Sequence, residues 1–330
     1  MPDLNIGGQA VIEGVMMRSK DRIATAVRKP DGEILIKTDP YRAISKRHKI
    51  LGLPIVRGAV SFVEMMIIGI KTLNFSADVA MKELEKAEAE AKGKEQDDKP
   101  PRSNNLMLGL TAVFAVGAGV FIFFFIPLAI SQFMGVDREA VGFNLVAGGI
   151  RLTMFLIYVW VLSLFGEFRR IFEYHGAEHK SIYCYEMGDE LIPERAKSHT
   201  RFHPRCGTSF ILIVALFAIA TYAISDTLYA IWMGHAPSLL ARFGIHFSLL
   251  PLVAGGSYEL LKLSGKTRDN KVTKILIRPG LWLQKITTKE PSTEQLEIGI
   301  AALKAALGME QDNVTTYSDD TTLVHSDPHQ

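Results

Sequence analysis

The feature that most constrains this chain is a continuous apolar run from Leu106 to Ile130, which contains no charged residue. About 20 consecutive apolar residues are enough to cross the hydrocarbon core of a bilayer as a helix. A helix of this length in a soluble protein would instead carry polar positions on one face. The run therefore predicts a transmembrane helix, and we expect an integral membrane protein.

Three further apolar runs predict a bundle of about four transmembrane helices. They cover roughly 141–165, 209–232 and 239–263, with few charges, among them Arg151, Asp226, Arg242 and Glu259. Basic residues gather after the second and fourth runs, whereas the loops 131–140 and 227–238 hold one basic residue between them. Because basic segments stay on the cytoplasmic side, both ends of the chain are expected in the cytoplasm.

Composition and the first residues narrow the class further. A net charge of +2 is too small to indicate a protein that binds nucleic acid. Two cysteines are too few for a small secreted fold held together by disulfides. The opening MPDLNIGGQAVIEG lacks the regions of a cleavable signal peptide, so insertion is expected to use the internal runs. The lipid bilayer is thus the first expected partner.

Residues 1–50 are expected to form a small cytoplasmic β-element. A Pro-Asp-Gly turn at 30–32 separates two short apolar segments, which predicts a hairpin over 23–36. The preceding GGQAVIEG segment contains glycines that permit close backbone approach, and Glu13 would need a partner if it were buried.

Residues 51–81 predict a long helix that differs from the four spans. Its charged residues recur every seven positions and would form one polar stripe, at Arg57, Glu64, Lys71 and Asp78. Basic clusters on both sides argue against a fifth span. An interfacial or re-entrant helix is favoured. The alternative is a helix packed against the bundle with its stripe toward water.

The remaining boundaries follow from charge and turn residues. We expect a charged linker over 82–105, a membrane domain over 106–263, a cytoplasmic segment over 264–308 and a disordered tail over 309–330. Within the third of these, Ser292 or Thr293 could cap an amphipathic cytoplasmic helix that ends at Leu307, before Gly308.

The segment after the second run carries the chemistry. His175 and His179 are spaced i, i+4, so on a helix both imidazoles share one face and could bind one metal ion. Glu178 completes the pattern H-x-x-E-H, in which the glutamate acts as general base. The alternative is an interfacial helix rich in basic and aromatic residues.

Further ligands are available downstream. His203 and Cys206 lie in the compact HPRCG motif, and Glu259 lies about 80 residues after His179, where an inverted zincin places its third ligand. Arg205 could stabilise developing negative charge. The alternatives are a structural turn for HPRCG, with Arg205 at lipid phosphates, and an interfacial Glu259 paired with a nearby cation.

Four motifs in order resemble one family. GGQAVIEGVMMRS, HGAEHKSIYCYE, HPRCGTSF and RPGLWLQKITTKEP are similar to the YqhQ-like bacterial membrane family, over roughly residues 5–308 without the linker. That family is described as a domain of unknown function and a predicted metal-dependent enzyme. The resemblance implies a multi-pass protein of the bacterial cytoplasmic membrane. It also draws attention to Thr287 and Thr288, which could line the cytoplasmic site.

Three functions compete at this stage. The first is a metal-dependent hydrolase, in which His175 and His179 bind a divalent ion such as Zn²⁺ with Glu259, His203 or Cys206, and a peptide or lipid headgroup is the substrate. The second is a non-catalytic membrane scaffold with a structural metal and a membrane-protein partner. The third is a transporter that uses the charges within the membrane.

Overall fold

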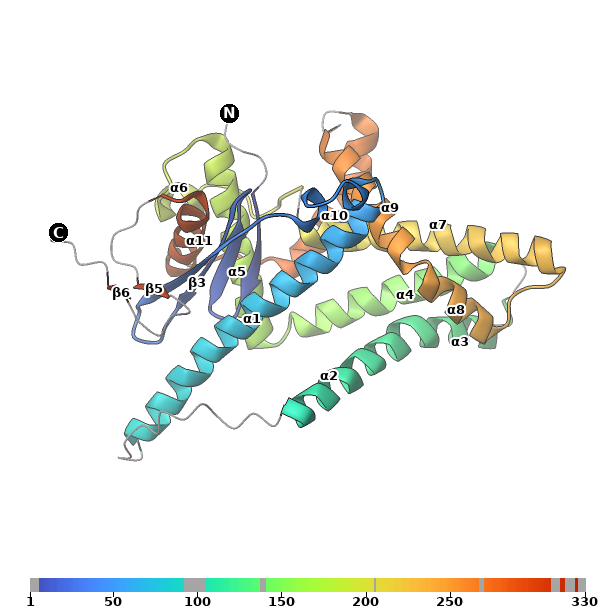
Figure 1. Cartoon of the computed structure of the whole chain (residues 1–330), viewed down its shortest axis with the longest axis horizontal. Coiled ribbons are helices and arrows are strands. Elements are labelled where there is room, and N and C mark those ends of the chain that lie inside the picture. Colours follow the sequence, from blue (N-terminus) through green and yellow to red (C-terminus); the bar gives the residue numbers. More distant parts are fainter. Residues whose placement is uncertain are drawn as a thin grey trace.

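The computed structural model describes residues 6–91, 105–136, 141–204, 206–266, 270–309, 315–317 and 324–325. The chain forms two parts (Figure 1). One is a compact domain in which helices cover both faces of a β-sheet, and the other is a set of long apolar helices that extends to one side. The fold is mostly helical, as the sequence predicts.

The sheet begins with two antiparallel hairpins at the N-terminus. Its strands are β1 (Gly7–Val11), β2 (Gly14–Arg18), β3 (Arg22–Arg28), β4 (Ile34–Pro40), β5 (Thr315–Tyr317) and β6 (Val324–His325), and they lie side by side in this order. The hairpin predicted over 23–36 is confirmed by the pairing of β3 with β4. Two short segments of the predicted disordered tail are strands, and β5 pairs in parallel with β4.

Both faces of the sheet are buried because alternate residues point to opposite sides. Val15, Met17 and Ala26 face a cluster formed with α5 (Gly166–Met187) and α11 (Thr293–Leu307). Residues in between, such as Met16, face α1 (Val56–Ala91) instead. The two hairpins are therefore the middle layer of a three-layer domain.

Helix α11 is capped as the sequence predicts. The Ser292 hydroxyl accepts from the Gln295 backbone N–H, the Gln295 side chain accepts from the Ser292 N–H, and Gly308 ends the helix at φ 73°. Its apolar positions are buried against the sheet and α5, and Leu296, Ile298 and Leu303 are fully enclosed. The helix is therefore a core element of this domain.

Helix α1 connects the two parts of the molecule. Two short 3₁₀ turns, η1 (Ile44–Lys46) and η2 (Ile50–Gly52), lead into it. The buried Glu64 carboxylate accepts from the Ile44 N–H at 2.9 Å, which fixes this lead-in. Helix α1 then packs against α9 (Leu250–Lys266), where Gly58 and Gly255 come into close contact. Its interfacial position stays a prediction.

Three helices are long and apolar enough to cross a membrane, by length and composition. These segments are Val113–Phe133, Val141–Leu162 and Phe210–Met233. They belong to α2 (Asn105–Val120) with the π-helical η3 (Phe121–Phe125) and α3 (Ile126–Phe133), to α4 (Val141–Leu162), and to α7 (Gly207–Met233).

The fourth predicted span is a bent pair. Helices α8 (Leu239–Ser248) and α9 meet at 49°, and together they pass the same test for a span. Two connecting helices complete the described elements, α6 (Pro193–Lys197) and α10 (Lys271–Thr287). Of the predicted linker, residues 82–91 continue α1, and 92–104 lie outside the described residues.

Candidate metal centre

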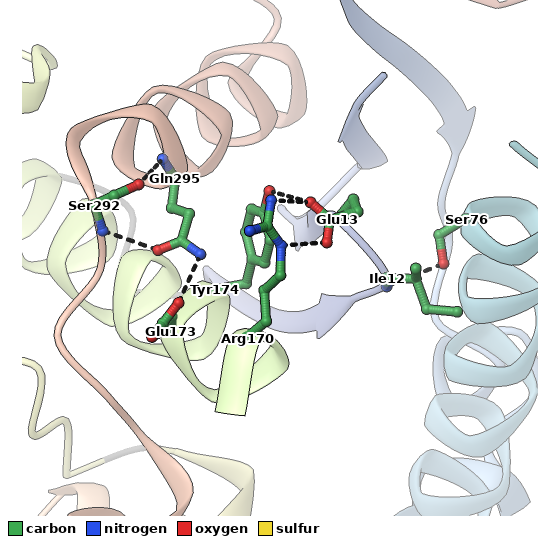
Figure 2. A network of polar contacts seen from close by, with 8 residues as sticks. All are labelled: Ile12, Glu13, Ser76, Arg170, Glu173, Tyr174, Ser292 and Gln295. Atoms are coloured by element: carbon green, nitrogen blue, oxygen red, sulfur yellow. Dashed lines mark hydrogen bonds and ion pairs between the residues drawn. The ribbon is translucent and has the colours of Figure 1, made fainter. Parts of the chain in front are cut away.

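Helix α5 is fixed in place by a polar network around the turn between β1 and β2 (Figure 2). Glu13 in this turn adopts a left-handed conformation, at φ 52°. Its carboxylate binds the Arg170 guanidinium with both oxygens and accepts from the Tyr174 hydroxyl at 3.2 Å. Burial, with the neighbouring Glu13 charge, raises the pKa of the Tyr174 phenol, which therefore remains a donor.

The same helix is tied to α11, and the hairpin is tied to α1. The Gln295 side chain donates to Glu173 at 3.1 Å, and the Ile12 N–H donates to the Ser76 hydroxyl at 3.2 Å. The β1–β2 turn and α11, which are far apart in sequence, thus hold the first half of α5, and α1 in turn holds the hairpin (Figure 2). The candidate site follows directly in the next turn of this helix.

His175 and His179 lie on one face of α5, with ring centroids 4.5 Å apart. The Nδ1 atom of His175 lies 2.8 Å from the Thr287 carbonyl oxygen, and that of His179 lies 2.5 Å from the Arg201 carbonyl oxygen. A carbonyl oxygen can only accept, so both rings carry their proton on Nδ1 and present a lone pair at Nε2. This is the tautomer that a metal-binding histidine needs.

Cys206 brings a sulfur atom to the same place. Its Sγ lies 3.1 Å from His175 Nε2, and the candidate ligand atoms of His175, His179 and Cys206 all lie within 4.8 Å of one another. His179 Nε2 is buried and has no hydrogen-bond partner within the described part of the chain. Burial lowers the pKa of His179 and keeps its imidazole neutral. The donor set therefore fits a transition-metal ion such as Zn²⁺.

Glu178 is buried beside this group. A Cβ atom built on Gly8 would lie 2.8 Å from Glu178 Cγ, so the carboxyl side chain packs against a position that only glycine can occupy. The Gly8 N–H hydrogen bonds to it, and burial raises the pKa of Glu178 to about 8. In the metal-free protein this carboxyl thus holds a proton at neutral pH, and a nearby cation would favour its release.

The segment after α10 crosses α5 in direct contact. A Cβ on Gly176 would lie 2.0 Å from the Lys289 carbonyl oxygen, and the Lys289 N–H donates to the Phe172 carbonyl at 2.8 Å. Thr287 is the last residue of α10 and directly precedes this segment, which explains how its carbonyl reaches His175. Arg201 donates to Thr288 from the opposite side. The late motif of the sequence thus lines the site.

The other residues that the sequence predicted for the site lie outside the three-residue group or outside the described residues. His203 lies next to His179, with ring centroids 5.7 Å apart, but its Nε2 is 3.5 Å from Glu186 and it is not part of the three-residue group. Glu259 is also outside the group, and its carboxylate pairs with Arg57 of α1. Arg205 lies outside the described residues.

Sequence reasoning missed the groups that orient the histidines. The carbonyls of Thr287 and Arg201 belong to the backbone, so no side-chain pattern marks them. The Gly8 contact with Glu178 had a weak signal in the paired glycines of GGQAVIEG. The paired glycines indicated that the backbone approaches another group closely, but they did not indicate that this group is Glu178.

Fold and site together define a mostly helical protein with three to four candidate membrane spans and a possible His/His/Cys metal group. The family described as "Protein of unknown function (DUF1385)" matches residues 53–309. The uncharacterized protein YqhQ of Bacillus subtilis (strain 168) is 34% identical over 308 residues, which are 92% of each chain. This chain belongs to the DUF1385 family, as the resemblance predicted. No solved structure matches it.

Proposed function

We propose that this protein is a metal-dependent hydrolase whose site faces the cytoplasmic surface of the membrane. The observation that carries the proposal is the paired orientation of His175 and His179 toward Cys206, next to a buried glutamate. Structural zinc sites use four protein ligands, whereas catalytic ones use three and keep a position open. Among the residues that the structure describes, three form the group, which favours catalysis over a structural role.

The residues of the candidate site would act as metal ligands, as orienting carbonyls and as a general base. His175, His179 and Cys206 would hold the ion, which supplies Lewis-acid activation of water when bound. Thr287 and Arg201 fix the imidazole tautomers through their carbonyls. Glu178 is the general base, because its carboxyl lies beside the group without belonging to the ligand set. A peptide or a lipid headgroup near the membrane is the proposed substrate.

The first experiment separates metal binding from catalysis. Protein purified in detergent should contain about one transition-metal ion per chain by elemental mass spectrometry, and His175→Ala/His179→Ala should contain none while remaining folded. Glu178→Gln should keep its metal and lose roughly 10²- to 10⁴-fold in hydrolysis of peptide or phospholipid substrates. Loss of metal from Glu178→Gln would instead make Glu178 a fourth ligand and the site structural.

A further inference from the structure

The interior of the helical part contains a second group of charged residues, separate from the metal centre. Within the described candidate spans, Arg151 lies at the middle of α4, Asp226 lies two turns before the end of α7, and Arg242 lies in the first turn of α8. Asp226 follows Cys206 by 20 residues, which is about 30 Å along a helix. What happens at these charges is therefore independent of the hydrolase proposal.

Asp226 is fully engaged by residues of two neighbouring helices. Its carboxylate forms an ion pair with Arg242 at 2.6 Å and accepts from His246 at 3.0 Å and from Asn144 at 2.8 Å. All four residues are buried. One carboxylate neutralises one guanidinium, so this cluster is electrically balanced while His246 is neutral.

Arg151 has a different environment. In an α-helix the Phe123 carbonyl would accept from the N–H of residue 127, but Pro127 has no N–H. The chain forms a π-helical turn over Phe121–Phe125, and Arg151 Nε donates to the Phe123 carbonyl at 2.9 Å. The bond satisfies one nitrogen and leaves the positive charge uncompensated. No carboxylate pairs with Arg151 in the part of the chain that the structure describes.

Arg151 and His246 share the same two aromatic neighbours. The Arg151 guanidinium carbon lies 4.7 Å from the Phe124 ring centre and 5.9 Å from that of Tyr222. The His246 ring stacks on Tyr222 at 4.0 Å and meets Phe124 at 6.3 Å. Its Nδ1 atom is buried without a hydrogen-bond partner among the described residues. The Arg151 guanidinium and the His246 ring thus contact the same two aromatic rings, and both have polar atoms that can still bind a ligand.

The charges in this interior do not sum to zero. Arg151 and Arg242 contribute two positive charges against the one negative charge of Asp226, because Glu259 is paired with Arg57. An uncompensated charge is expensive within a membrane and marks a functional site. We propose that Arg151, with His246 beside it, binds a small monovalent anion between η3, α4, α7 and α8.

The depth of Arg151 selects the kind of anion. Arg151 is the eleventh residue of the 22-residue helix α4, so it lies about 15 Å from each end. Lipid headgroups lie outside a hydrocarbon core about 30 Å thick, beyond the reach of this position. A free inorganic anion or a small carboxylate fits, and a lipid phosphate does not.

Thermal unfolding of the full chain in detergent tests the proposal. Chloride, bromide, nitrate or acetate would replace gluconate at constant ionic strength, which keeps general screening unchanged. The expected result is a saturable rise of the unfolding midpoint with at least one of these anions. Arg151→Gln should raise the half-saturating concentration roughly 10- to 100-fold, since a charged hydrogen-bond donor is lost. Arg169→Gln, at an exposed position on α5, should behave like the wild type.

Two further variants keep the test decisive if Arg151→Gln does not fold. Arg151→Lys retains the charge but loses the bond geometry, so it should bind the anion more weakly. Asp226→Asn adds a net positive charge, so its midpoint should rise more steeply with the anion than that of the wild type. Equal midpoints in all anions, or unchanged binding in Arg151→Gln and Arg151→Lys, would overturn the proposal. So would native mass spectrometry showing a bound anionic lipid that Arg151→Lys loses.

Discussion

At the scale of single residues, the candidate metal group combines His175 and His179 of α5 with Cys206, which directly precedes α7. The i, i+4 interval placed His175 and His179 on one face, because a helix dictates that geometry by itself. For the third ligand the sequence offered Glu259, His203 and Cys206 as alternatives, and only Cys206 joins the group. Glu259 is engaged by Arg57, about 200 residues earlier, and no local pattern contains that pairing.

Gly8 provides a test of how Glu178 is positioned. In Gly8→Ala the new methyl would lie 2.8 Å from Glu178 Cγ and 2.7 Å from the Met16 carbonyl oxygen, so the carboxyl must move. We expect metal content to be retained and hydrolysis to fall at least about tenfold, because misplacement of a general base by a fraction of an ångström is costly. Gly7→Ala is the matched control, since a Cβ there meets nothing within 4 Å. Equal activity of both variants would separate Glu178 from the reaction.

At the scale of elements, the sequence predicted the limits of helices that have capping residues, but it did not predict which elements those helices pack against. The cap at Ser292 and the stop at Gly308 gave α11 its limits. Its burial against β2 and β3 could not be foreseen, since these strands lie more than 250 residues earlier. Likewise the run 239–263 predicted one span, but the structure bends it by 49° between α8 and α9, next to Pro251, which has no N–H to continue the helix.

The crossing at Gly176 gives a prediction for α5. Gly176→Ala would place a methyl 2.0 Å from the Lys289 carbonyl oxygen, and backbone cannot yield as a side chain can. We expect a loss of roughly 1–3 kcal/mol in unfolding free energy, together with loss of metal because Thr287 is displaced from His175. Thermal unfolding and elemental analysis would measure both. Gly166→Ala, on the same helix with open space around it, should leave both unchanged.

At the scale of the whole molecule, packing and membrane topology constrain each other. The sheet, α5 and α11 share one core, so they must lie on the same side of the membrane. The chain must then cross an even number of times between β4 and α5, and again between α5 and α11. The candidate spans α2–α3 and α4 would supply the first pair. If α7 crosses, the bent pair α8–α9 has to be the return span.

Cysteine labelling tests this topology. A cysteine at His235, in the exposed loop between α7 and α8, should react with an impermeant maleimide in intact cells. Cysteines at the exposed positions Asp31 and Met309 should react only after the cells are permeabilised. The native Cys184 and Cys206 are buried and provide a low background. Labelling of Met309→Cys but not of Asp31→Cys in intact cells would contradict an even number of crossings, and labelling of both would reverse the orientation.

The contact between the N-terminal sheet and α11 also has a consequence for biosynthesis. Strands β1 to β4 leave the ribosome first, but α11 begins at Thr293. At synthesis rates of about 5–20 residues per second, roughly 10–50 s separate the two. During this interval Val15 and Met17 lack the helix that buries them in the finished domain. The nascent chain thus needs protection from aggregation while its membrane segments are being inserted, and any message truncated before codon 293 yields a protein that cannot complete its first domain.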